Sequence, residues 1–165
     1  MRIWLLMAVG GVLLLSLNQT HALNNSNILV NFSQLVQAIE NGDNVRAIIH
    51  FDNCLVKESA SQTQKERRLE GATTRFNFTH FFHAQEKIND QLIDTVTTSM
   101  KIFIERPSGE LLTFSGRLSV FEDNTATLHL DFFNPILHKH QLVLDWLCTI
   151  SNGEDDNGLV LFNFF

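Results

Sequence analysis

Two cysteines are the residues whose type and placement point most directly to a chemistry. The sequence of 165 residues contains 2 cysteines, Cys54 and Cys148, and no Cys-x-x-Cys pair. Paired sulfurs are typical of proteins that fold in an oxidising compartment. We therefore expect one disulfide between them, which would stabilise the chain by about 4–5 kcal/mol in the chain-entropy model. Two unpaired buried thiols are the alternative.

No serine or cysteine has the setting of a catalytic nucleophile, which needs a neighbouring base. If both cysteines are bonded, neither can attack a substrate. Ser108 lies in Pro-Ser-Gly-Glu and Ser115 in Phe-Ser-Gly-Arg, and neither matches the glycine-flanked elbow of a hydrolase. The sequence has no phosphate-cradling loop and no dinucleotide fingerprint. We expect no catalytic residues and no cofactor.

The histidines give a weak indication of a metal site. The two histidines of His80-Phe81-Phe82-His83 would point to opposite faces of a predicted strand. His138 and His140 would share one face of a strand. His129 or Asp131 would lie near that pair. Surface histidines in a loop are the preferred interpretation, so we expect no metal.

The segment Gln141–Ile150 predicts the strand that holds Cys148. Apolar side chains recur at every second position: Leu142, Leu144, Trp146, Cys148 and Ile150. Because side chains alternate across a strand, they share one face, and their composition is that of a core. Asp145 falls on the other face and is expected to point outward. Cys54 ends an earlier apolar strand, so a disulfide would place the first and late strands of a sheet side by side.

One helix is predicted before these strands, over Asn31–Asn41. Its apolar residues follow the three- and four-residue spacing of one helical face: Phe32, Leu35, Val36 and Ile39. Ser33 can cap its start and Gly42 marks its end. The preceding residues, Leu23–Leu29, are rich in asparagine and predict a loose lead-in.

Alternating apolar residues predict strand after strand in the rest of the chain. The predicted strands cover residues 45–51, 73–84, 94–104, 112–120, 126–132, 141–150 and 159–165. Gly116 predicts a bulge inside its strand, and Asn152–Gly158 predicts a flexible acidic loop. In the last strand, Val160, Phe162 and Phe164 share a face. The pattern predicts an α+β domain in which one N-terminal helix packs on a mainly antiparallel sheet of about seven strands. Such a sheet can curl into a half-barrel.

The first 22 residues have the organisation of a secretory signal peptide. Met1-Arg2 is positive, Ile3–Leu17 is apolar, and Thr20-His21-Ala22 carries small residues at its first and last places. We expect a signal peptide over 1–22, cleavage after Ala22, and a single domain over 23–165. An uncleaved membrane anchor is the alternative, although the apolar run is shorter than a span needs. A cleaved chain would be periplasmic or secreted and would not span a membrane.

Charge and aromatic content narrow the classes of partner. The formal net charge is −6 and becomes −7 once Arg2 is removed with the leader. An acidic chain without a basic stripe argues against nucleic acid as a partner. The chain contains 14 Phe and no Tyr. A Phe-rich core is the preferred explanation, and an exposed or ligand-lining aromatic patch is the alternative.

The order of these features resembles the VirK family of small exported bacterial proteins. Phe32–Gly42 followed by Val45–Cys54 is similar to the family's helix, glycine and cysteine-ended strand. Leu118–Phe133 resembles its late hairpin, and Cys148 with Gly158–Phe162 resembles its C-terminal cysteine and aromatic strand. The family is named for its association with virulence genes. The resemblance therefore implies export and a fold, without a mechanism.

Three functions follow from these observations, in order of preference. The first is a non-enzymatic, virulence-associated exported protein that acts through contacts with an unidentified protein or envelope component. The second is a carrier of a small apolar ligand in a Phe-lined pocket. The third is a hydrolase, which would need a pocket where a serine, a histidine and a carboxylate converge.

Overall fold

The structure is a computed structural model that describes residues 26–57 and 71–164. The predicted signal peptide 1–22 lies outside the described residues. The elements run in the order β1 (Ser26–Leu29), α1 (Phe32–Glu40), β2 (Asn44–His50), the 3-10 turn η1 (Phe51–Asn53), β3 (Leu55–Val56), β4 (Thr73–Asn77), β5 (Phe81–Ile88), β6 (Gln91–Glu105), β7 (Leu111–Phe121), β8 (Thr125–Asn134), β9 (Lys139–Thr149) and β10 (Leu159–Phe164).

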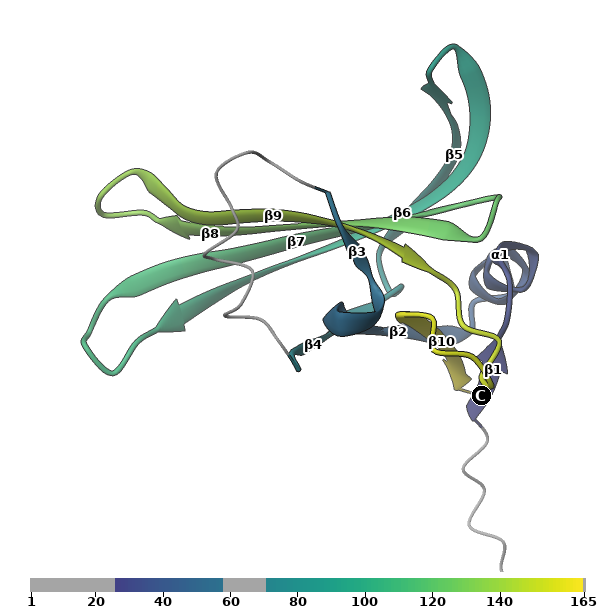
Figure 1. The fold of residues 1–165 in the computed structure, drawn as a ribbon, viewed down its shortest axis with the longest axis horizontal. Coiled ribbons are helices and arrows are strands. Elements are labelled where there is room, and N and C mark those ends of the chain that lie inside the picture. The colour runs from purple at the N-terminus through teal and green to yellow at the C-terminus, as the bar shows by residue number, and fades with distance from the viewer. Residues whose placement is uncertain (1–25, 58–70, 165) are drawn as a thin grey trace, which may run out of the picture.

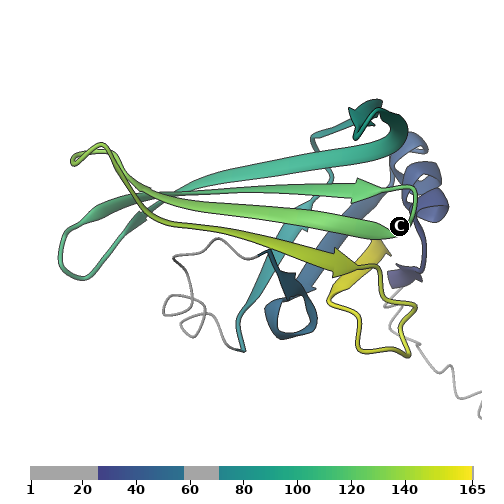
Figure 2. The same ribbon diagram turned by 45° about the horizontal axis from the view of Figure 1, so that its top comes forward.

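The strands form two antiparallel sheets. The smaller sheet has the order β1-β10-β2-β4, and the larger sheet has the order β3-β9-β8-β7-β6-β5. Figure 1 shows the long strands of the larger sheet reaching well beyond the smaller sheet on one side, and Figure 2 shows β7, β8 and β9 running side by side. The expected combination of one helix with mainly antiparallel strands is confirmed for the described residues. The single sheet of about seven strands curling into a half-barrel is wrong, because the described strands form two open sheets.

The division into two sheets comes from a turn that the phenylalanine pattern conceals. We predicted one strand over 73–84, but β4 ends at Asn77 and β5 begins at Phe81 in the other sheet. The Thr98 hydroxyl lies 2.9 Å from the Asn77 carbonyl and 2.8 Å from the His80 carbonyl, and its single hydrogen is shared between them. These bonds satisfy the carbonyls of the turn from inside the larger sheet. A turn without glycine or proline leaves no clear mark in the sequence.

Helix α1 follows a strand and so is not the first element of the chain. Ser26–Leu29, predicted as a loose lead-in, pairs with β10 as strand β1. Asn31, and not Ser33, caps the helix, because its Oδ1 accepts the Gln34 N–H at 2.9 Å. Gly42 follows the helix at φ +82°, a conformation that favours glycine. A four-residue strand has too little apolar pattern to be read without its partner.

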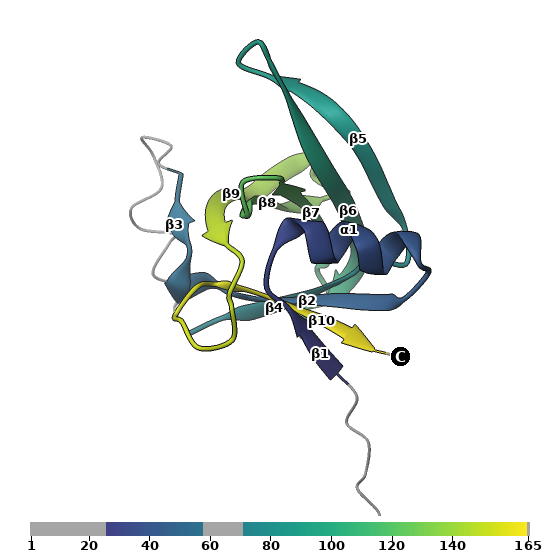
Figure 3. The same ribbon diagram turned by 90° about the vertical axis from the view of Figure 1, so that its right-hand side faces the viewer.

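The helix crosses the end of the molecule between the two sheets (Figure 3). Its buried side chains are Phe32, Leu35, Ala38 and Ile39. At its first residue, the Phe32 N–H donates to Asn124 Oδ1 in the β7–β8 turn, at 2.8 Å. At its last residue, Glu40 Oε1 lies 3.2 Å from His83 Nδ1 on β5. The helix is thus fixed at both ends to the larger sheet while it follows β1 of the smaller one.

A glycine in β7 lies where the two sheets pack against each other. Gly116 lies inside β7 and is paired on both sides without a register shift, so the predicted bulge is wrong. A Cβ at this position would lie 2.8 Å from Phe76 Cζ and 3.0 Å from Leu130 Cδ2. Phe76 belongs to β4 of the smaller sheet and is 1% exposed. Gly116 is therefore explained by space, since it allows the ring of the facing sheet to pack against β7.

The disulfide lies where the chain passes from one sheet to the other. Cys54 and Cys148 are bonded with a Cα–Cα distance of 4.5 Å, as expected from the sequence. After β2, the turn η1 redirects the chain, and β3 pairs with β9 opposite Leu147 and Trp146. The strand beside β9 is thus the two-residue β3, and the expectation that the longer β2 would lie there is wrong. The cause is the 3-10 turn, which separates Cys54 from β2.

We predict that Gly116→Ala destabilises the fold by about 1–3 kcal/mol, the usual cost of overpacking a core. The measurement is urea unfolding followed by tryptophan fluorescence. In a Phe76→Leu background the same substitution should cost less, because the smaller side chain leaves room for the methyl group. Equal costs in both backgrounds would contradict the packing explanation. Ser115→Ala, at the neighbouring half-buried position, is the matched control.

We predict that Cys148→Ser lowers the free energy of unfolding by about 2–5 kcal/mol, as does removal of a native bridge from a small exported domain. Adding a reductant should lower the urea midpoint of the wild-type protein to that of the variant and leave the variant unchanged. A wild-type midpoint insensitive to reductant would show that the bridge does not stabilise the fold.

Candidate functional site

The histidines proposed as weak metal ligands form separate pairs with single carboxylates. His140 Nδ1 lies 2.8 Å from Asp131 Oδ1, and His129 Nδ1 lies 2.8 Å from Asp145 Oδ1. His138 is in the β8–β9 turn at φ +49°, so the expectation that it shares a strand face with His140 is wrong. Among the described residues, no group of three or more His, Cys, Asp or Glu side chains is arranged to hold a metal ion. Asp145 is exposed, as expected.

His83 lies between two carboxylates. Its Nδ1 is 3.2 Å from Glu40 Oε1 and its Nε2 is 3.0 Å from Asp94 Oδ1. Ser33 and Asp94 line one pocket of about 570 Å³. A histidine acts as a base toward a serine only when a ring nitrogen can accept the hydroxyl proton. Both ring nitrogens of His83 contact carboxylates, so this cluster connects α1 to the larger sheet and does not form a nucleophile–base pair.

Large apolar side chains are exposed at one end of the larger sheet. We call them the hairpin-end patch, and its members are Ile102, Phe103, Leu111, Ile136 and Leu137. They share one end of the sheet but not one face, because the successive residues Ile102 and Phe103 point to opposite sides of β6. Phe103, in β6, is 75% exposed, and Leu137, in the β8–β9 turn, is 66% exposed. The two hairpins end on the same side of the molecule (Figure 1). The sequence contains a signal that could have identified part of this patch. Two large apolar residues, Ile136-Leu137, directly follow the strand-breaking Asn134-Pro135, where a polar turn is usual.

Glu110 joins the two hairpin ends. Its Oε1 accepts from Asn134 Nδ2 at 2.9 Å and from Gln141 Nε2 at 2.7 Å. Its Oε2 accepts from Arg106 Nη1 at 2.9 Å, within its own hairpin. The hydrogen bonds from Gln141 and Asn134, with a smaller contribution from Arg106, hold the pKa of Glu110 below its usual value. One ionised carboxylate therefore connects the ends that carry the apolar patch.

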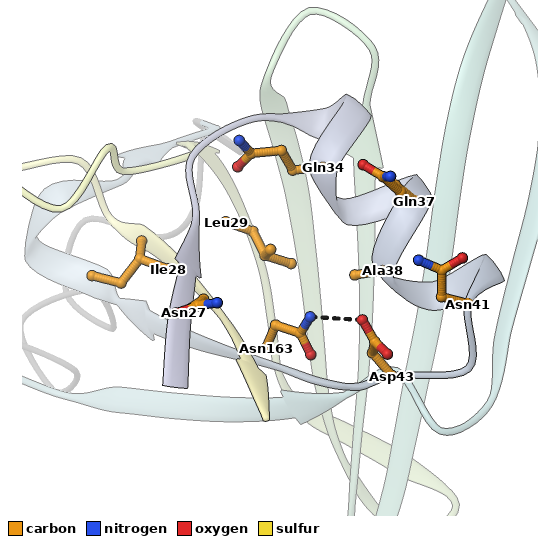
Figure 4. Close-up of a pocket in the computed structure, with 9 residues that line it drawn as sticks. All are labelled: Asn27, Ile28, Leu29, Gln34, Gln37, Ala38, Asn41, Asp43 and Asn163. Atoms are coloured by element: carbon orange, nitrogen blue, oxygen red, sulfur yellow. Dashed lines mark hydrogen bonds between the residues drawn. The ribbon is translucent and has the colours of Figure 1, made fainter. Parts of the chain in front are cut away.

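A polar groove lies beside α1 at the other end of the structure. It has a volume of about 500 Å³. We call it the amide groove, and its lining residues are Asn27, Ile28, Leu29, Gln34, Gln37, Ala38, Asn41, Asp43 and Asn163. Figure 4 shows the polar side chains coming from β1, α1, the turn between α1 and β2, and β10, with Leu29 and Ala38 between them. Five of the nine lining side chains are amides, a composition that the sequence analysis did not anticipate.

The amide groove contains a hydrogen-bonded pair of a buried asparagine and a half-buried aspartate. Asn163 is 4% exposed, and its Nδ2 donates to Asp43 Oδ2 at 2.7 Å. Asn163 Oδ1 is buried and has no hydrogen-bond partner. In β10 the face of Leu159, Leu161 and Asn163 is the buried one, while the face singled out in the sequence is half-buried. The same alternation could therefore have identified an asparagine on the core face.

The acidic loop after β9 is closed by its own side chains. We predicted a flexible loop over Asn152–Gly158, but Asn152 Oδ1 accepts two backbone N–H groups, and Asp155 Oδ1 accepts the N–H of Asn157. Hydrogen bonding from the Ser151 hydroxyl, and then from the N–H groups of Asn152 and Asn157, lowers the pKa of Asp155. The carboxylate of Asp155 therefore stabilises the conformation of its own loop.

These features define a small, disulfide-bonded α+β protein whose described residues form two open antiparallel sheets with one helix across their end. The family model described as VirK protein matches residues 28–136. The chain therefore belongs to the VirK family, as its sequence resemblance indicated.

A solved structure supports the fold. The chain is similar to lpg1832, a VirK family protein from Legionella pneumophila, with a TM-score of 0.58 and 16% sequence identity. The match covers 82% of this chain and 98% of that chain. At this identity the likeness concerns the fold alone. A search of curated proteins gave no match.

We predict that lowering the pH loosens the connection between the hairpin ends. A carboxylate whose pKa is lowered by folding stabilises above its unfolded pKa, and this contribution is lost as the pH falls through the folded value. In Glu110→Gln this part of the pH dependence should be absent. Thermal unfolding of both proteins between neutral and acidic pH provides the measurement. Glu105→Gln, on the same hairpin but without bonds to the second one, should follow the wild-type curve, and a Glu110→Gln curve parallel to wild type would contradict the assignment.

Proposed function

We propose that this VirK-family protein is exported and works as a non-enzymatic interaction protein whose hairpin-end patch contacts a protein of the bacterial envelope. The patch carries the proposal, because monomeric proteins rarely expose grouped apolar side chains without a use. Aromatic and large aliphatic side chains in such groups are the usual anchors of protein interfaces. The disulfide is compatible with an oxidising compartment outside the cytoplasm.

A protein partner fits the charge of the chain better than an anionic lipid surface does. The net charge is −6, and binding to anionic membranes relies on clustered basic residues. The charged neighbours of Phe103 are of both signs, with Lys101 on one side and Glu105 on the other. Within the described residues, no helix is long and apolar enough to cross a membrane.

The alternatives have less support. A carrier of a small apolar ligand would need a Phe-lined pocket, whereas Phe32 is the one phenylalanine among the residues that line the three described pockets. A hydrolase would need a histidine nitrogen directed at a nucleophile. His83 contacts carboxylates through both ring nitrogens. His129 lines a pocket with Ser99 and Ser115 and contacts Asp145 through Nδ1, but it makes no hydrogen bond to either serine.

We predict that a photoreactive amino acid at position 103 or 137 of the full-length protein, expressed in its own host, captures one discrete protein of the envelope. Purification of the exported form, with its first residue placed at Leu23 by N-terminal sequencing, supplies the sample. The matched control is position 82, because Phe82 is 64% exposed but lies in β5, away from the patch.

Three results would overturn the proposal. They are equal capture from positions 82 and 103, capture of lipid alone, and recovery of the chain only from the cytoplasm.

Phe103→Ser with Leu137→Ser should abolish the adduct formed through position 136 while leaving the thermal midpoint unchanged, because both side chains are already exposed. A catalytic role would instead appear as turnover that survives these substitutions.

A further inference from the structure

The amide groove has the size and position of a ligand site that the proposed interaction function does not use. Its volume of about 500 Å³ is within the range of small-molecule pockets, roughly 300–1,000 Å³. It lies beside α1 and β1, whereas the hairpin-end patch is on the opposite side of the molecule (Figure 1). The two sites can therefore be tested independently.

The lining side chains select for a neutral polar ligand. Asn27, Gln37 and Asn41 bring exposed amides, each of which offers two N–H donors and one acceptor oxygen. Asp43 is the one charged side chain among the lining residues, and no lysine, arginine or histidine lines the groove. An anionic ligand would meet a carboxylate without a compensating cation, so phosphates and acidic groups are disfavoured.

Hydrogen bonds inside the protein already fix part of this lining. Gln34 Oε1 accepts the Val30 N–H at 2.8 Å, which leaves its amide nitrogen as a donor. Asn163 Nδ2 holds Asp43 through Oδ2 at 2.7 Å, which leaves Asp43 Oδ1 as an acceptor. Fixed groups lose little freedom on binding, so they contribute more affinity than mobile side chains. The groove thus presents a prearranged donor and a prearranged acceptor.

The buried Asn163 is difficult to explain by stability. Its Oδ1 lacks a hydrogen-bond partner, and burying an acceptor without a hydrogen bond is destabilising. An apolar side chain at this core-facing position would avoid that cost. Asn163 instead holds Asp43 at the wall of the groove. Presenting that carboxylate to a ligand would explain why Asn163 and Asp43 are paired here, whereas core packing does not explain it.

We propose that the amide groove binds a neutral, hydroxyl-rich sugar. Each sugar hydroxyl both donates and accepts, as each lining amide does, so adjacent hydroxyls can be matched by single side chains. The apolar Leu29 and Ala38 would lie against the C–H groups of the ring (Figure 4). A bound peptide would rely on adding a strand to a sheet edge, and β1 has only four residues to pair with one.

The test is ligand-observed NMR on the folded wild-type protein with neutral disaccharides as probes, namely N-acetylglucosamine disaccharide, cellobiose and maltose. An uncharged alanine-rich hexapeptide and a sugar phosphate complete the panel. We expect saturable binding of at least one neutral disaccharide and none of the peptide. Binding by none of the three disaccharides, or by the peptide or sugar phosphate in their place, would overturn the sugar assignment.

Variants place the binding in the groove. Asp43→Ala should weaken it by about tenfold or more, because a hydrogen bond to a charged group is lost. Gln85→Ala, which removes an exposed amide from β5, should leave the affinity unchanged. Asn163→Val should weaken binding without lowering the thermal midpoint. Affinity unchanged in Asp43→Ala, or a loss of stability in Asn163→Val that accounts for the loss of binding, would overturn the role of the pair.

Discussion

The junction around Cys54 is the constraint on which the arrangement of the two sheets depends. Cys54 is bonded to Cys148 in β9, and Gly158 just before β10 packs against its sulfur. A Cβ on Gly158 would collide with Cys54 Sγ and would lie 2.9 Å from the carbonyl oxygens of His50 and Asn53. The Gly158 carbonyl also accepts the His50 N–H at 2.8 Å. Residues 50–54 therefore meet the end of β9 and the residue just before β10 at one point, which sets where the smaller sheet lies relative to the larger.

The consequences of that junction differ at the two ends of the molecule. Near it, the smaller sheet covers the larger one, and the side chains of both sheets form the core, including Ile49, Leu128 and Trp146. Farther away, the long hairpins extend past the smaller sheet (Figure 2). Ile102 is on the core-facing side of β6 and is 48% exposed beyond the described strands of the smaller sheet, whereas Phe103 points to the outer face of the larger sheet. Strand length therefore explains the exposure of Ile102, because strands β6–β9 are longer than the sheet that packs against them.

The amide groove arises from a different mismatch. Helix α1 is tied to the larger sheet through Asn124 and His83, whereas β1, just before it, belongs to the smaller sheet. Helix α1 and strand β1 therefore diverge from the short segment that connects them. The gap at the end of β10 is filled by polar side chains and not by core residues. An aspartate that would be costly in a closed core is acceptable here because Asp43 is only half-buried, whereas Asn163 stays buried with an unpartnered Oδ1.

The sequence by itself determined the features that depend on neighbouring residues. Period-two patterns identified β9 and its buried face, from Leu144 to Cys148, and the three- and four-residue spacing identified α1. The two cysteines predicted their own disulfide, and the order of elements predicted the family. These inferences hold because local alternation and helical periodicity report which face of an element is buried, whatever it is buried against.

Only the tertiary structure decided which element each face meets. The phenylalanines show the difference: Phe76 and Phe114 are buried, while Phe82 and Phe103 are exposed, although all four lie in alternating strands. The sequence cannot show that β4 and β5 belong to different sheets, that Gly116 faces a ring of the opposite sheet, or that Asp43 meets Asn163 across 120 residues. Burial and pairing of this kind depend on the length and placement of the facing layer, which no local pattern encodes.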